Sequence, residues 1–165
     1  MSDTDLPAIP GQTLDDAVVF AALLEPDRRL IGMDLGTKTI GLALSDVNRS
    51  IASSLETIRR KKFSIDVVVL LNIAEQHEIG GFVLGLPVNL NGTEGPRAQA
   101  TRSFARNVNQ RSVLPILLWD ERMTTQAATR LLIEADSSRK RRAEVVDKMA
   151  ATLILQGALD RMRSI

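Results

Sequence analysis

Two apolar stretches separated by only four residues place the strongest constraint on how this chain folds. Leu30–Asp34 and Thr39–Ser45 both read as β-strands, and residues 35–38, Leu-Gly-Thr-Lys, join them. A link this short holds no crossover helix, so the two strands are expected to pair as an antiparallel hairpin. A third strand is expected over Ser53–Ile58, ended by the basic cluster at residues 59–62.

Beyond the third strand, the pattern alternates between helix and strand. Apolar spacing predicts a helix over Ile65–Gln76, stopped by Gly80 and Gly81, and then a short buried strand over Phe82–Leu86. A turn-rich segment at 89–96 leads to the remaining elements, which are a helix over 97–108, a strand over 114–119, a helix over about 125–135, a polar and basic loop at 136–142 and a helix over about 143–162. This order predicts an α/β fold with one mixed five-stranded sheet flanked by helices.

The chain is expected to form one domain over residues 29–165, preceded by a partly flexible extension over residues 1–28. A length of 165 residues fits a single domain, and no interdomain linker is evident. Residues 1–12 contain two prolines and a glycine, and Thr13 is a candidate cap for a short helix over Leu14–Leu24 that ends near Pro26.

Composition excludes several kinds of site. The absence of cysteine excludes disulfides, thiolate catalysis and cysteine-based zinc sites, and His77 alone cannot form a histidine-rich metal site. The N-terminus lacks the features of a secretory signal, and no run approaches the ~20 apolar residues of a membrane span. A cytoplasmic protein without membrane contact is therefore expected. Four phenylalanines, one tryptophan and no tyrosine argue against base stacking as the main basis of nucleic-acid binding.

Carboxylates end two of the predicted strands. Asp34 closes the first strand just before Gly36, and Asp120 and Glu121 follow the fifth. Strand ends can present such groups to a metal or a phosphate, although Asp is also a common turn former. Because successive side chains of a strand face opposite ways, we expect one carboxylate of the second pair to face Asp34. We predict Asp120 in that role, with Glu121 beside the metal ligands or the substrate.

Asp147 is the third candidate, since it lies among the apolar residues of the last predicted helix. A buried carboxylate there needs a partner, which is either a metal ion or the helix N-terminus or a nearby basic residue. Asp34, Asp120 and Asp147 together supply hard oxygen ligands, which suit Mg²⁺ or Mn²⁺ better than zinc. Two such ions ~4 Å apart can cleave a phosphodiester bond, and Glu121 is included among the catalytic candidates.

Basic residues suggest how a nucleic acid would be held. They gather at residues 59–62 and again at Arg139-Lys140-Arg141-Arg142, just before the helix that carries Asp147. Such clusters are commonly only solvated, yet they also match a phosphate backbone. Lys38, four residues after Asp34, and Arg122, next to Glu121, are further candidates for substrate binding.

Three segments resemble the YqgF/RuvX family, whose members are described as pre-16S rRNA nucleases and as Holliday-junction-resolvase-like proteins. They are RLIGMDLGTKTIGLALSD (29–46), VLGLPVNLNGTEGPRAQATRSFA (83–105) and WDERMTTQAATRLLIEADSSRKRRAEVVDKMAATLILQ (119–156). The resemblance implies a ribonuclease H-like fold and a role in trimming the 5′ end of precursor 16S rRNA. It assigns the family's acids to Asp34, to the Asp-Glu-Arg motif at 120–122 and to Asp147, and it implies that Glu94 and Arg97 face the substrate.

This sequence departs from many ribonuclease H relatives at the end of the fourth strand. The strand ends in Gly85-Leu86-Pro87, where those relatives carry a carboxylate. The resemblance therefore implies that Asp120, Glu121 or Glu94 substitutes if two metals bind.

Several alternatives remain open at this point. Four-way DNA junctions are the second candidate substrate, and a symmetric homodimer would suit them, whereas a monomer would suit single-strand trimming. A non-catalytic nucleic-acid-binding assembly factor would keep the same fold. Asp34-Leu35-Gly36-Thr37 also resembles the phosphate loop of actin-like and sugar-kinase-like ATPases, which need two such domains. ATP would raise the melting temperature only in that last case.

Overall fold

A computed structural model describes the backbone of residues 11–123 and 139–165, and the side chains of residues 11–123 and 149–165. The elements are β1 (Thr13–Leu14), α1 (Ala17–Leu23), β2 (Arg29–Leu35), β3 (Thr39–Ser45), β4 (Ala52–Arg59), α2 (Phe63–Gln76), β5 (Ile79–Leu86), α3 (Pro96–Asn109), β6 (Ile116–Asp120), the 3₁₀ helix η2 (Glu121–Met123) and α5 (Arg139–Arg163). The predicted helix at about 125–135 lies outside the described residues.

The strands form one mixed sheet in the order β1-β6-β5-β2-β3-β4. β2 and β3 pair as the predicted antiparallel hairpin, while β2, β5 and β6 run parallel to one another. β2 therefore lies inside the sheet, next to β5. The carboxyl ends of β2, β5 and β6 consequently meet at one edge, which is where an open α/β sheet presents its site.

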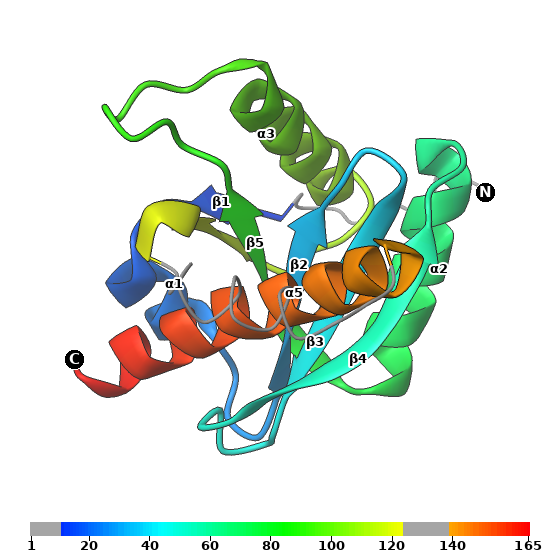
Figure 1. The fold of residues 1–165 in the computed structure, drawn as a ribbon. Coiled ribbons are helices and arrows are strands. Elements are labelled where there is room, and N and C mark those ends of the chain that lie inside the picture. Colours follow the sequence, from blue (N-terminus) through cyan, green and yellow to red (C-terminus); the bar gives the residue numbers. More distant parts are fainter. Residues whose placement is uncertain (1–10, 124–138) are drawn as a thin grey trace.

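Helices cover both faces of the sheet (Figure 1). α2 and α3 enclose a core with Met33, Phe82 and Leu84 on one face. α1 and α5 enclose a second core with Val83 and Trp119 on the other. Buried on both faces, β5 is almost continuously apolar, as central parallel strands are. No helix in the described part of the chain is both long enough and apolar enough to span a membrane.

The predicted fold class is confirmed, but the sheet has six strands instead of five. The additional strand is β1, whose Thr13 and Leu14 pair in parallel with β6. The first helix starts later than predicted and is capped by Asp16, whose side chain accepts a hydrogen bond from Val18 N at 2.8 Å. Phe20 of α1 is fully buried, so part of the predicted extension contributes to the core.

Two other boundaries differ from the sequence-based prediction. Gly80 and Gly81 do not stop α2 but lie inside β5; the helix ends at Gln76, and Glu78 makes the turn with a φ of +54°. At the C-terminal side, the backbone of residues 139–142 forms the first turn of α5 instead of the predicted loop. Arg and Lys are both good helix formers, so a basic first turn is compatible with helix propensity.

Candidate active site

Asp34 lies at the carboxyl edge of the sheet, on the face covered by α5. Its neighbour two residues earlier, Gly32, lies against Leu155 and the Ala151 carbonyl of α5, and alternation places Asp34 on the same face. β2 and β5 pair residue by residue up to Met33 and Leu84, so Gly85 is the next residue beside Asp34. The apolar hairpin thus holds Asp34 near the end of a central strand.

Glu121 supplies the second carboxylate of this edge. It is the first residue of η2, and its side chain turns back over β5 to form a hydrogen bond with Asp34. Its Oε1 atom lies 2.7 Å from the position that a Cβ atom on Gly85 would take. The carboxylate therefore occupies room that exists because residue 85 has no side chain.

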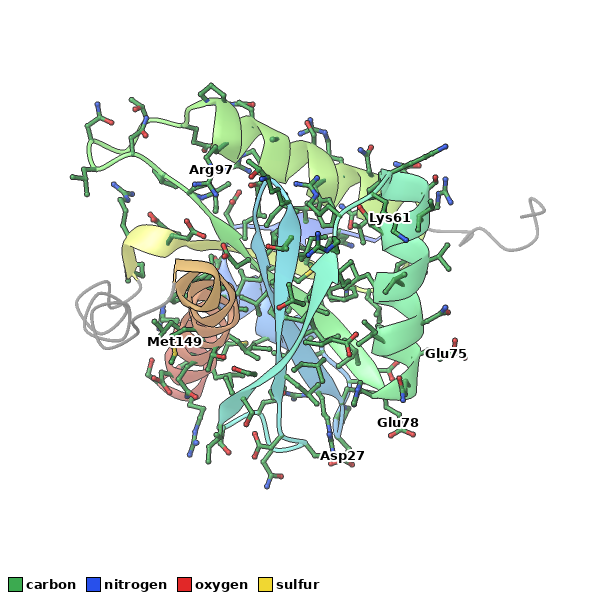
Figure 2. All side chains as sticks on the ribbon, turned by 45° about the vertical axis from the view of Figure 1, so that its right-hand side comes forward. Asp27, Lys61, Glu75, Glu78, Arg97 and Met149 are labelled. Carbon is green, nitrogen blue, oxygen red and sulfur yellow. The ribbon has the colours of Figure 1, made fainter. Side chains whose placement is uncertain are left out.

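The environment of Glu121 favours its protonated form. Removal from solvent raises the pKa of Glu121 to about 7, and the negative charge of Asp34 adds to this effect. Arg97, at the start of α3, acts in the opposite direction through its positive charge. Figure 2 shows Arg97 at the end of the molecule that carries the β2–β3 hairpin. The carboxylates of Asp34 and Glu121 are neighbours with Arg97 beside them, and a further positive charge would stabilise the ionised form of both.

Asp120 does not take the position predicted for it. Its carboxylate binds Arg122, with Nη2 at 2.7 Å from Oδ2 and Nε at 3.0 Å, and it also accepts a hydrogen bond from Arg122 N at 2.9 Å. These hydrogen bonds hold the pKa of Asp120 below its usual value. The structure thus brings Glu121, and not Asp120, into contact with Asp34. Trp119 packs on the α5 face, so alternation past it puts Asp120 on the opposite face and returns Glu121, at the start of η2, to the face of Asp34.

Glu94 points to α3 instead of to Asp34 and Glu121, which together form the acid pair. Its carboxylate binds Arg102 at 2.6 and 2.9 Å, and this contact lowers the pKa of Glu94. Arg102 also reaches Asp15 at 3.5 Å. The sequence did not indicate Arg102, because nothing in the spacing of its neighbours distinguishes it from other basic residues of the helix. Its partner lies eight residues earlier, across a turn.

A cleft of about 570 Å³ opens at the end of β6 and η2, and neither Asp34 nor Glu121 is among the residues that line it. Asp120, Arg122, Glu94, Arg102 and Trp119 are among the residues that line it. The loop between β5 and α3 forms one wall and is braced internally, since Asn89 N donates to the Thr93 carbonyl at 2.9 Å. Arg122 Nη1 reaches the Leu90 carbonyl at 3.4 Å and so connects that loop to η2. The cleft carries charges of both signs, and Arg102 and Arg122 are already paired with Glu94 and Asp120.

The other predicted substrate-binding residues are only partly described. Lys38 is exposed at the tip of the β2–β3 hairpin, at the same edge as Asp34. Arg60, from the first basic cluster, donates to the Gly36 carbonyl at 2.5 Å and so fixes that tip. The side chains of Arg139–Arg142 and of Asp147 lie outside the described part of the structure. The backbone of Asp147 belongs to α5, one turn before Ala151.

The comparisons with known proteins place the chain in a family. The family model RuvX, described as Holliday junction resolvase, matches residues 28–161. A protein of Rhodobacter capsulatus is 60% identical over 153 residues, covering 93% of either chain, and one of Ruegeria pomeroyi is 58% identical over 146 residues, covering 88% of this chain and 95% of its own. Both carry the name "Putative pre-16S rRNA nuclease". A solved structure, Thermus thermophilus RuvC in complex with a Holliday junction substrate, shares the fold with a TM-score of 0.50 at 14% identity, covering 83% of this chain and 97% of its own.

Proposed function

Because the chain belongs to the RuvX family, we propose that it is a metal-dependent endonuclease that hydrolyses phosphodiester bonds in the 5′-end processing of precursor 16S rRNA. The observation that carries this proposal is the contact between Asp34 and Glu121 at the carboxyl edge of the sheet. Relatives at 58–60% identity that bear the name of a pre-16S rRNA nuclease support the choice of substrate. Precursor rRNA as the substrate implies that the protein acts in the cytoplasm.

The residues of this edge fit a divalent metal ion. Both side chains offer oxygen, and the pKa of Glu121 is raised mainly by burial and also by the charge of Asp34, which a cation would neutralise. Oxygen ligands without cysteine, and with the only histidine at residue 77 after α2, favour Mg²⁺ or Mn²⁺. Within residues 11–123 and 149–165, no group of three or more acidic or histidine side chains is placed to hold a metal.

Asp147 is the proposed third ligand. In helical spacing it falls four residues before Ala151 and seven before Ile154, so it shares their face of α5. Ala151 lies against Gly32 and Ile154 against Gly85, the residues that precede and flank Asp34 in the sheet. A residue one turn closer to the N-terminus of α5 on that face is suited to complete the site.

Bound divalent ions would activate a water molecule and stabilise the leaving oxygen of the phosphodiester. The chain's own residues prepare the substrate for this reaction. Asp34 and Glu121 would hold the cation, whereas Asp120 is already bound to Arg122. Arg97 lies close enough to Glu121 to affect its ionisation, so it can contact a phosphate next to the cation. Lys38 and Arg122 extend the positive charge on either side, along the hairpin and the cleft.

Cleavage assays on matched substrates test the proposal. Precursor 16S rRNA, an RNA duplex and a four-way DNA junction are compared with Mg²⁺ and with Mn²⁺. We expect cleavage near the 5′ end of the mature rRNA, whereas efficient cleavage of the junction alone would make the protein a junction resolvase. No cleavage of any of the three would leave a binding factor.

Substitutions then test the site. Asp34→Asn and Glu121→Gln should each abolish metal-dependent cleavage, while Asp120→Asn should retain more of it. Glu56→Gln, on the exposed side of β4, is the matched control. If Asp120→Asn is inactive and Glu121→Gln is active, the assignment of these two residues is reversed.

A further inference from the structure

The loop that joins β5 to α3, residues 87–95, extends from the edge of the sheet that carries the acid pair (Figure 1). Internal hydrogen bonds shape it, since Gly92 N donates to the Asn89 carbonyl at 2.8 Å and Thr93 N donates to Asn91 Oδ1 at 3.1 Å. These bonds fix the shape of the loop but not its direction from the sheet. The direction depends on contacts with other elements.

Arg102 of α3 anchors the end of this loop. Its Nε atom lies 2.6 Å from Glu94 Oε1 and its Nη2 atom lies 2.9 Å from Glu94 Oε2, so the two side chains form a bidentate ion pair. The side chains of Arg102 and Glu94 are only 28% and 29% exposed. A bidentate pair that is largely withdrawn from solvent holds its partners in one geometry better than an exposed pair does.

The helix provides a fixed point for this anchor. Ala98, Phe104 and Ala105 of α3 are buried in the core, so the backbone around Arg102 does not move with the loop. Arg102 Nη2 also reaches Asp15 Oδ1 at 3.5 Å, which connects the same guanidinium to the segment between β1 and α1. Two of its three nitrogen atoms therefore face carboxylates of the protein.

The tip of the loop has a second, weaker contact. Arg122 Nη1 donates to the Leu90 carbonyl at 3.4 Å, while the rest of the guanidinium binds Asp120. A length of 3.4 Å is long for a hydrogen bond, so this contact alone is a poor anchor. Release of Glu94 from Arg102 would therefore free the loop.

Arg97 connects the loop to the proposed reaction. It follows the loop directly, in the first turn of α3, and its positive charge acts on the carboxyl group of Glu121. It lies five residues before Arg102, which is about 140° around a helix of 3.6 residues per turn, so the two arginines point in different directions. A strand that reaches the acid pair therefore passes Arg97 and the adjoining loop, whereas Arg102 faces the protein.

We propose that Arg102 is a positioning residue for the substrate, which holds the β5–α3 loop where it receives the RNA strand beside the acid pair. The proposal rests on the proposed function, since it takes RNA as the substrate. Arg102 acts through Glu94 and makes no contact with the RNA. Without the anchor, the loop is in the binding conformation for only part of the time, and a fraction of about one tenth would raise the apparent Kd ~10-fold.

Binding of a single-stranded segment of precursor 16S rRNA in Ca²⁺, together with amide hydrogen exchange, tests this role. Arg102→Gln should raise the Kd for the RNA ~10-fold and speed exchange at residues 88–95. Mg²⁺ should protect it in thermal melts as it protects the wild type, because the acid pair is unchanged. Arg102→Lys, which keeps the charge and one hydrogen bond, should lie between the two. Arg106→Gln, one turn further along α3 and exposed, is the matched control.

Glu94→Gln separates positioning from direct contact. If Arg102 acts through Glu94, this variant should also weaken RNA binding, and Arg102→Gln with Glu94→Gln should bind no more weakly than the weaker single variant. If Arg102 instead binds a phosphate, loss of the competing carboxylate should strengthen binding, and the proposal is wrong. Asp15→Asn controls for the loss of a negative charge in the same cleft and should change the Kd less than ~2-fold.

A lower melting temperature of Arg102→Gln with an unchanged Kd would mean that the ion pair serves only stability, and would overturn the proposal. Neither binding nor amide exchange needs cleavage. A wild type that binds the RNA without cutting it would contradict the proposed function alone. Normal cleavage with an unchanged Kd in Arg102→Gln would contradict the role of Arg102 alone.

Discussion

Gly85→Ala should impair cleavage by displacing Glu121, and the surroundings of residue 85 allow the effect to be sized. A Cβ atom there would lie 2.7 Å from Glu121 Oε1 and 2.5 Å from Ile154 Cδ1. Non-bonded carbon and oxygen atoms approach to about 3.3 Å. The carboxylate must therefore move by roughly 0.6 Å, and a shift approaching 1 Å in a catalytic group can cost up to ~100-fold in rate.

The same substitution also strains the core, because carbon atoms prefer separations of ~3.5–4.0 Å and Ile154 is 1% exposed. Overpacking of this kind costs about 1–3 kcal/mol of unfolding free energy, or roughly 2–12 °C in melting temperature for a chain of this size. We expect cleavage to fall ~10–100-fold, with weaker protection of the protein by Mg²⁺ in thermal melts.

A second substitution separates the two effects. Ile154→Val removes the Cδ1 atom that collides with residue 85, so Gly85→Ala with Ile154→Val should regain much of the melting temperature but little of the cleavage. Gly81→Ala is the matched control, since it adds a methyl group to the same strand against Phe20 at 3.0 Å, far from the acids. If the Gly85→Ala/Ile154→Val protein cleaves at the wild-type rate, cleavage does not require the Glu121 carboxylate to occupy the space above residue 85.

Two further predictions concern charge. In EDTA, the unfolding free energy should fall as the pH rises from 4.5 to about 7, because folded Glu121 holds its proton up to about pH 7 whereas the unfolded chain releases it near 4.5. The loss is up to about 3 kcal/mol. Denaturant titrations at pH 5 and pH 8 measure it, and Glu121→Gln should remove it. An equal pH slope in both proteins would contradict this origin. Replacing all four residues of 139–142 with Gln should lower the slope of log affinity against log salt by ~0.7 for each phosphate of single-stranded RNA that these residues neutralise, measured in Ca²⁺ to limit turnover; an unchanged slope would mean that they do not bind the RNA backbone.

Short-range constraints make part of this fold predictable from sequence. The four-residue link between β2 and β3 permits only a hairpin, and the short apolar run of β5, between glycines and a proline, favours a buried strand. β1 escapes prediction because two residues carry no periodicity; its pairing depends on β6, about a hundred residues away. Gly80 and Gly81 resemble a helix stop, yet they serve β5, where Arg28 lies 2.6 Å from the place of a Cβ atom on Gly80 and Phe20 lies 3.0 Å from that on Gly81. Local glycine rules cannot anticipate contacts made by distant segments.

Two features that look separate in the sequence together explain the contact between Asp34 and Glu121. One is the absence of a carboxylate at Gly85, and the other is the choice among Asp120, Glu121 and Glu94. Arg122 holds Asp120 and Arg102 holds Glu94, and each ion pair lowers the pKa of its acid.

Glu121 differs from these two, since its pKa is raised and it lies against Asp34. Its carboxylate reaches that position only through the space over Gly85, after the chain has left the strand and entered η2. The missing side chain on β5 and the choice of carboxylate after β6 are therefore one structural fact. Strand alternation gives this choice only once Trp119 is known to pack on the α5 face, and that depends on its contact with Gly157 of a distant helix.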